Sequence, residues 1–196
     1  MTTIRNLNPG NSNRPLVVTT VAELRKAFTD LRETKKAIEY FDKAYAQCPS
    51  NGNHSLCASL LSDIALVYFD TFEYEKAIRY SKASIKEDDE KFIDERNLAF
   101  SYGVIGDAYL GLAEQSKKKI HLDSAAHYID RAIIFHKEIN AWQALYDDYI
   151  SLWKINKLRG NFAESLKNFE LAVAYKDSMF NADNRETIKN LEDKRA

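Results

Sequence analysis

Residues 74–88 read YEKAIRYSKASIKED, and three other stretches of the chain repeat the same arrangement of small and large residues. They are TKKAIEYFDKAYAQCP (34–49), LDSAAHYIDRAIIFHKE (122–138) and FAESLKNFELAVAYKD (162–177). In each stretch a small residue is followed by Tyr or Asn three positions later and by a second small residue after seven. The first small residues are Ala37, Ala77, Ala125 and Ser165, spaced 40, 48 and 40 residues apart. Self-similarity at such a period predicts a repeat fold, in which each copy is one supersecondary unit.

A second amphipathic segment precedes each of these stretches. Its large and small residues recur at offsets 0, 3, 4 and 7, which places them on one face of a helix. The match is clearest in the second and third copies, and it is weaker in the first, from Val21, and in the fourth, from Tyr149. Each copy is therefore predicted to be a pair of helices. In the second and third copies these residues are Leu61, Ile64, Ala65 and Tyr68, then Tyr102, Ile105, Gly106 and Tyr109.

The distribution of helix breakers predicts an all-α fold. The chain has 196 residues, of which only 3 are proline and 6 are glycine. The prolines are Pro9, Pro15 and Pro49, so the long remainder of the chain contains none. A sheet protein of this size needs more turn residues than this, whereas long stretches rich in Ala, Leu, Lys and Glu favour helix.

The paired segments resemble the tetratricopeptide repeat (TPR), a helix–turn–helix unit with the pattern W-x2-L-G-x2-Y, then A-x3-F, then P. Pro49 lies where that family has its terminal proline, and Gly160-Asn161-Phe162 resembles the turn between its two helices. The resemblance implies a right-handed superhelix of about four hairpins whose first helices line a concave face. The copies here are longer than the family's period, and the third carries an insertion of about seven residues near 116–121, expected to be a solvated loop with the basic run 117–119.

The predicted organisation has three parts. Residues 1–16 are a flexible leader, residues 17–178 are the TPR-like domain, and residues 179–196 are a polar C-terminal helix that could begin a coiled coil. The segment 176–192 is similar to the junction in Bacteroidetes-type regulators, where a TPR region leads into a histidine-kinase or helix-turn-helix output domain. A simple capping helix is the alternative for this C-terminal segment. The four repeats are expected at about 17–50, 54–88, 92–138 and 140–177.

Composition excludes several classes of protein. The formal net charge of −1 lacks the concentrated positive field of a nucleic-acid surface. Only two cysteines are present, Cys48 and Cys57, so a disulfide framework is excluded and a cytoplasmic location is expected. No apolar stretch is long enough to span a membrane.

No catalytic, cofactor or metal site is predicted. His54 and Cys57 form an H-x-x-C pair without the further ligands that a metal needs, so a loop histidine and a buried helix cysteine are favoured. Three other histidines are expected to be partly exposed on a helix. For Asp107, beside two glycines, an interhelical hydrogen bond is favoured over a contact with a partner. The three histidines are His121, His127 and His136.

The predicted function is non-enzymatic binding of a protein or peptide in the concave face, as the sensory or scaffolding part of a bacterial signalling or transcription regulator. A stand-alone TPR adaptor and a peptide-pheromone-type receptor are the alternatives. An α-helical enzyme would need a cluster of convergent ionisable groups. A homodimer through the C-terminal helix is compatible with the pattern. Helix phase predicts the peptide-binding residues Lys26, Ser62, Leu66, Phe69, Phe100, Asp107, Ile150, Lys154 and Lys157.

Overall fold

The computed structural model describes residues 54–89, 94–178 and 185–195. Throughout these ranges the secondary structure is α-helix joined by turns, which confirms the all-α prediction. The leader, the first repeat and Lys26 lie outside the described residues. The helices are α4 (His54–Asp70), α5 (Tyr74–Asp89), α6 (Glu95–Ser116), α7 (Lys119–Glu138), α8 (Trp142–Arg159), α9 (Phe162–Ser178) and α10 (Arg185–Arg195).

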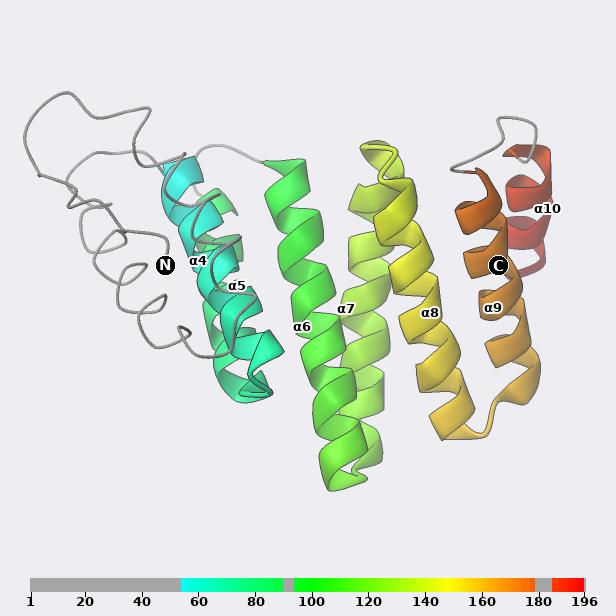
Figure 1. Cartoon of the computed structure of the whole chain (residues 1–196), viewed down its shortest axis with the longest axis horizontal. Coiled ribbons are helices and arrows are strands. Elements are labelled where there is room, and N and C mark those ends of the chain that lie inside the picture. Colours follow the sequence, from blue (N-terminus) through cyan, green and yellow to red (C-terminus); the bar gives the residue numbers. More distant parts are fainter. Residues whose placement is uncertain (1–53, 90–93, 179–184, 196) are drawn as a thin grey trace, which may run out of the picture.

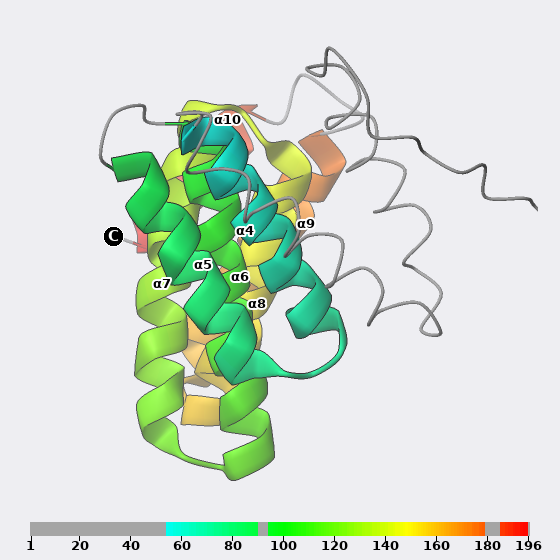
Figure 2. The same cartoon turned by 90° about the vertical axis from the view of Figure 1, so that its left-hand side faces the viewer.

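Six of these helices form three antiparallel hairpins that follow one another in chain order (Figure 1). α4 packs on α5, α6 on α7 and α8 on α9, and the hairpins meet through the pairs α5–α6 and α7–α8. The first helices also touch, α4 with α6 and α6 with α8. Figure 2 shows α5 and α7 toward one side of the stack and α4, α6 and α8 toward the other. The first helices therefore share one side of the molecule.

Each described turn between helices contains one residue with a positive φ angle. These residues are Phe72, Lys117, Asn140 and Gly160, with φ of 61°, 56°, 53° and 81°. At Gly160 the left-handed conformation costs little, because glycine has no Cβ, and the turn closes with the Asn161 amide donating to the Asn156 carbonyl at 2.9 Å. Tight turns of this kind hold the two helices of a hairpin antiparallel.

The extra residues of the third repeat are built into helices. α6 and α7 have 22 and 20 residues, whereas α4 and α5 have 17 and 16. Only Lys117 and Lys118 lie between α6 and α7, and Lys119 is the first residue of α7. The expected solvated loop is therefore wrong, although all three lysines are exposed. The insertion contains no Pro or Gly, so extending both helices keeps its backbone hydrogen-bonded.

Two apolar clusters form the core, and small residues allow their helices to approach closely. The first joins α4, α5 and α6, and the second runs from α6 to α10. A Cβ atom added at Gly106 would lie 2.6 Å from the Ile129 side chain of α7, and one at Gly111 would lie 2.3 Å from the Tyr74 ring of α5. Gly106 thus leaves room for Ile129 within one hairpin, and Gly111 leaves room for Tyr74 between two hairpins.

α10 packs back on the end of the stack. Ile188 is buried and Leu191 is partly buried against the second cluster. In this arrangement these two apolar residues are covered by the preceding helices. Among the described helices none is both long and apolar enough to traverse a lipid bilayer.

Candidate functional site

Apart from Lys26, which lies outside the described residues, the residues predicted for peptide binding lie on α4, α6 and α8. We call seven of them the first-helix face. Phe69 and Phe100 are partly buried, whereas Lys154 and Lys157 are exposed. The face thus has apolar positions on α4 and α6 and two exposed lysines on α8. Its members are Leu66, Phe69, Phe100, Asp107, Ile150, Lys154 and Lys157.

Ser62 does not belong to this face, so its prediction is corrected. It is 3% exposed, because α6 covers this side of α4. Its Oγ lies 2.8 Å from that of Ser84, 2.9 Å from that of Ser101 and 2.6 Å from Asn97 Oδ1. Ser84 Oγ also donates to the Ala58 carbonyl at 2.7 Å. This network of neutral groups joins α4, α5 and α6, and we call it the serine junction.

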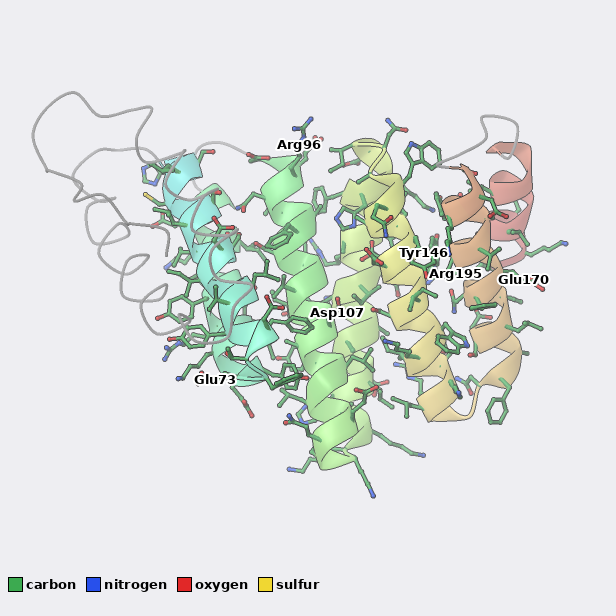
Figure 3. All side chains as sticks on the ribbon, viewed as in Figure 1. Glu73, Arg96, Asp107, Tyr146, Glu170 and Arg195 are labelled. Atoms are coloured by element: carbon green, nitrogen blue, oxygen red, sulfur yellow. The ribbon has the colours of Figure 1, made fainter. Side chains whose placement is uncertain are left out.

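Asp107 lies between α6 and α8 (Figure 3), where Ser151 Oγ donates a hydrogen bond of 2.6 Å to its Oδ1. Ser151 is 44 residues away in the chain, so this is the interhelical hydrogen bond that was favoured for Asp107. Burial raises the pKa of Asp107 to about 6, and the nearby charge of Asp148 adds to the shift, while the Ser151 hydrogen bond and Lys154 oppose it. Asp107 therefore changes its charge around pH 6.

His136 and Asp148 form a buried pair that joins α7 to α8. His136 Nδ1 lies 2.6 Å from Asp148 Oδ2, and the two residues are 8% and 5% exposed. Burial raises the pKa of Asp148, and the contact with His136 opposes this shift. The prediction that His136 is partly exposed is wrong, because the start of α8 covers it. We call the pairs Asp107–Ser151 and His136–Asp148 together the acidic junction.

The acidic junction is a group of convergent ionisable side chains, which is the feature that an enzyme site would show. General acid–base catalysis also needs the group to reach a substrate proton. Here one oxygen of each carboxylate is occupied by a neighbouring helix, Asp107 by Ser151 and Asp148 by His136. The arrangement joins three helices, α6, α7 and α8, through two hydrogen-bonded pairs. Sequence analysis missed the His136–Asp148 pair, because nothing in a single sequence indicates a pairing across the α7–α8 turn.

The other histidines contact neighbouring side chains, and Cys57 lies in the core. His121 stacks on Tyr109, with ring centroids 6.1 Å apart, and His127 meets the ring of Tyr128 edge-on. His54 is the first residue of α4 and lies 3.1 Å from Glu87. Cys57 is buried, as expected, whereas Cys48 lies outside the described residues. In the described ranges no three His, Cys, Asp or Glu residues gather as a metal site would require.

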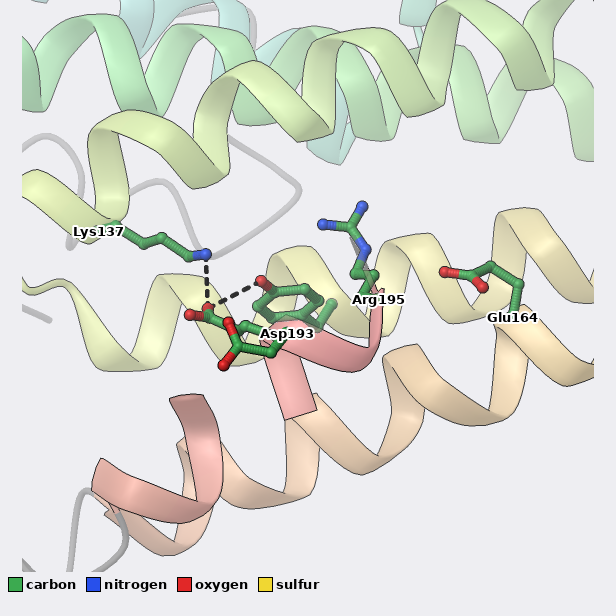
Figure 4. A pocket seen from close by; sticks show the side chains of 6 residues that line it. Lys137, Glu164, Asp193 and Arg195 are labelled. Atoms are coloured by element: carbon green, nitrogen blue, oxygen red, sulfur yellow. Dashed lines mark hydrogen bonds and ion pairs between the residues drawn. The ribbon is translucent and has the colours of Figure 1, made fainter. Parts of the chain in front are cut away.

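A pocket of about 440 Å³ lies under α10 (Figure 4). Glu192 is one of the residues that line it, and it accepts hydrogen bonds from Tyr175 Oη at 2.7 Å and Tyr149 Oη at 3.3 Å and pairs with Lys137 at 2.5 Å. Burial disfavours the charge of Glu192, but the hydrogen bonds from Lys137 and Tyr175 outweigh it and lower its pKa. Burial, reinforced by Glu192, raises the pKa of both tyrosines. These contacts attach α10 to the body of the protein.

Comparisons with protein-family models, with curated proteins and with solved structures gave no match to this chain. Its function is therefore inferred from the arrangement of its own residues.

Proposed function

We propose that this chain is a non-enzymatic, TPR-type module that binds a peptide or protein segment on the first-helix face. The observation that carries the proposal is the alignment of α4, α6 and α8 in contact along one side of the stack. A ligand lying across three adjacent helices meets side chains from each of them. We further propose that the module serves as the sensory or scaffolding part of a bacterial signalling or transcription regulator.

The composition of the first-helix face indicates what kind of segment it would bind. Partly buried Leu66, Phe69 and Phe100 offer apolar contacts, and the exposed ammonium groups of Lys154 and Lys157 lie at the α8 end. A segment with apolar anchors followed by acidic residues fits this order, because apolar pockets supply affinity and charges fix the register.

The test is selection of binders from a library of random peptides displayed on phage, followed by titration of the enriched peptides. We expect enriched peptides to combine apolar and acidic residues. Lys154→Glu should weaken them by tenfold or more, which corresponds to about 1.4 kcal/mol. The matched control is Lys86→Glu, which makes the same charge change at an exposed site on α5. Peptides that bind both variants equally well would refute the assignment of the face.

A further inference from the structure

α9 exposes a row of large apolar side chains along its length. Phe162, Leu166, Phe169 and Val173 are 70%, 58%, 41% and 39% exposed. Their spacing of four, three and four residues places them on one face of the helix. A contiguous apolar surface of this kind marks an interaction site more often than isolated exposed residues do. We call these four residues the α9 row.

The repeat register shows that the same positions are covered in the two preceding hairpins. Counted from the small residues Ala77, Ala125 and Ser165, the α9 row corresponds to one set of positions in α5 and one in α7. In those helices every position of the set is buried or partly buried. The corresponding residues are Tyr74, Ile78, Ser81 and Ile85 in α5, and Leu122, Ala126, Ile129 and Ile133 in α7.

In both earlier hairpins the first helix of the next hairpin packs on this second helix, although Ile129, the counterpart of Phe169, lies against Gly106 of its own hairpin. α6 covers α5, and Tyr74, which corresponds to Phe162, lies directly against Gly111 of α6. α8 covers α7, with Leu122 and Ile133 in the same core cluster as Leu152. The position over the α9 row is therefore shaped for a helix that crosses α9 as α6 crosses α5.

α10 does not occupy this position. It contacts α9 through Tyr175 and through Lys167, whose Nζ donates to the Lys194 carbonyl at 2.9 Å. At 100° per residue these side chains lie on a different side of α9 from Phe162 and Phe169. The row stays exposed with α10 in place, and α8 reaches its edge, where Trp153 meets Phe169.

The edges of the α9 row carry opposite charges. On the α8 side, Lys157 lies over Trp153, and the Trp153 ring is 5.6 Å from that of Phe169. On the other side, Glu170 is exposed one position after Phe169. A second copy packed antiparallel about a two-fold axis would place Lys157 near its own copy and Glu170 near its own copy. Such like-charge contacts disfavour an antiparallel pair of two copies through the α9 row.

From this geometry we infer that the α9 row is the docking site for an amphipathic helix of a partner protein, lying where the first helix of a further hairpin would lie. The partner helix presents apolar residues at helical spacing, a small residue opposite Phe162, as Gly111 lies opposite Tyr74, and acidic residues along the edge that faces Lys157. The inference rests on the stacking register of α9, and the site shares Lys157 with the first-helix face.

The probe for this test is a synthetic peptide with the sequence of residues 95–116, because that helix covers the corresponding face of α5. The fluorescently labelled peptide is titrated with the full chain and followed by anisotropy. We expect saturable binding that Leu166→Glu weakens at least tenfold. Ile134→Glu, on α7 and 56% exposed, is the matched control and should leave the affinity unchanged. A peptide of scrambled sequence should not bind.

Three outcomes would overturn the inference. The first is the absence of saturable binding, and the second is equal affinity of the Leu166→Glu and Ile134→Glu variants. The third is a dimer, measured by light scattering, that Leu166→Glu converts to a monomer, since the occupant would then be a second copy. Lys154→Glu and its control Lys86→Glu test the first-helix face. A negative result in that test therefore leaves the result for the α9 row unchanged.

Discussion

The serine junction and the acidic junction perform the same task with different chemistry. Both lie between consecutive first helices and join three helices across a hairpin boundary. Ser62, Ser84, Asn97 and Ser101 have no group that titrates near neutral pH. The acidic junction contains Asp107, whose pKa is raised to about 6 by burial, together with a His–Asp pair. Two neighbouring boundaries of similar geometry should therefore differ in their response to pH.

This difference indicates that hairpin stacking does not depend on one kind of polar contact. The apolar clusters set which helices meet, and most polar groups buried where helices meet are then hydrogen-bonded, although Ser81 Oγ has no such partner among the described residues. Hydroxyl groups satisfy this requirement at a low cost of burial. Carboxylates satisfy it only with partial neutralisation, which makes the second boundary sensitive to protons.

The largest expected effect comes from Asp148→Ala. This change leaves His136 buried without its partner, so we expect the free energy of unfolding to fall by about 3 kcal/mol. Urea denaturation followed by far-UV circular dichroism measures it. Asp147→Ala, at an exposed neighbouring position, is the control and should cost no more than about 0.5 kcal/mol. Equal losses for the two variants would mean that the pair does not stabilise the boundary.

Asp107→Asn should stabilise the protein at pH 8 by about 2 kcal/mol, because a charge held at a cost is removed while an acceptor for Ser151 remains. The folded-state pKa of Asp107 is raised to about 6, so the folded state binds the proton more tightly than the unfolded state. The wild-type protein thus gains stability as the pH falls through 6, and the advantage of the variant should shrink toward pH 5. An advantage that is constant over this range would contradict the assigned shift.

Ser62→Ala should cost about 1 kcal/mol, since Ser84 keeps its contacts with Ala58, Asn97 and Ser101. The loss should be the same at pH 5 and pH 8, unlike the effect at Asp107. Parallel denaturation curves of both variants at the two pH values make the comparison direct. A pH-dependent loss would mean that an ionisable group reaches the serine junction.

Glu192→Gln, outside both junctions, should have the smallest effect on global stability, below about 1 kcal/mol for a partly exposed pair. The pKa of Glu192 is lowered, so its contribution is present at neutral pH and is lost as the pH falls through the folded-state value. Hydrogen exchange should become faster in residues 185–195 and stay unchanged in α4 and α5. Unchanged exchange in α10 would show that its apolar contacts are sufficient to hold this helix against the rest of the protein.

The sequence predicted the hairpins because their spacing follows a packing requirement. The small residues Ala77, Ala125 and Ser165 are 0%, 0% and 4% exposed, and only small side chains fit where two helices approach so closely. Because the residue at such a position must be small in each copy, small residues recur at a regular interval in the sequence. Ser62 was assigned to an exposed face and is buried, because rotation by one residue places a side chain under the next helix.

The polar boundaries could not be predicted in the same way. Burial of His136 depends on where α8 begins and on which α8 residue lies against His136. The helical pattern of α7 indicates neither.

The length of the helices in the third repeat was indicated by the sequence. Residues 116–121 contain no Pro or Gly, which a loop of that length would be expected to contain. The α9 row also had a signal in its four-three-four spacing.

The neighbour-to-neighbour packing of the hairpins has a mechanical consequence. The hairpin α4–α5 reaches α8–α9 through α6 and α7, the two longest described helices. A shift produced by a ligand at one end must be carried across this middle hairpin, through a boundary made of hydroxyl groups on one side and of carboxylates on the other. The hairpin α6–α7 then connects two boundaries, and we expect the strength of the contacts at the acidic junction to change as protons bind or leave.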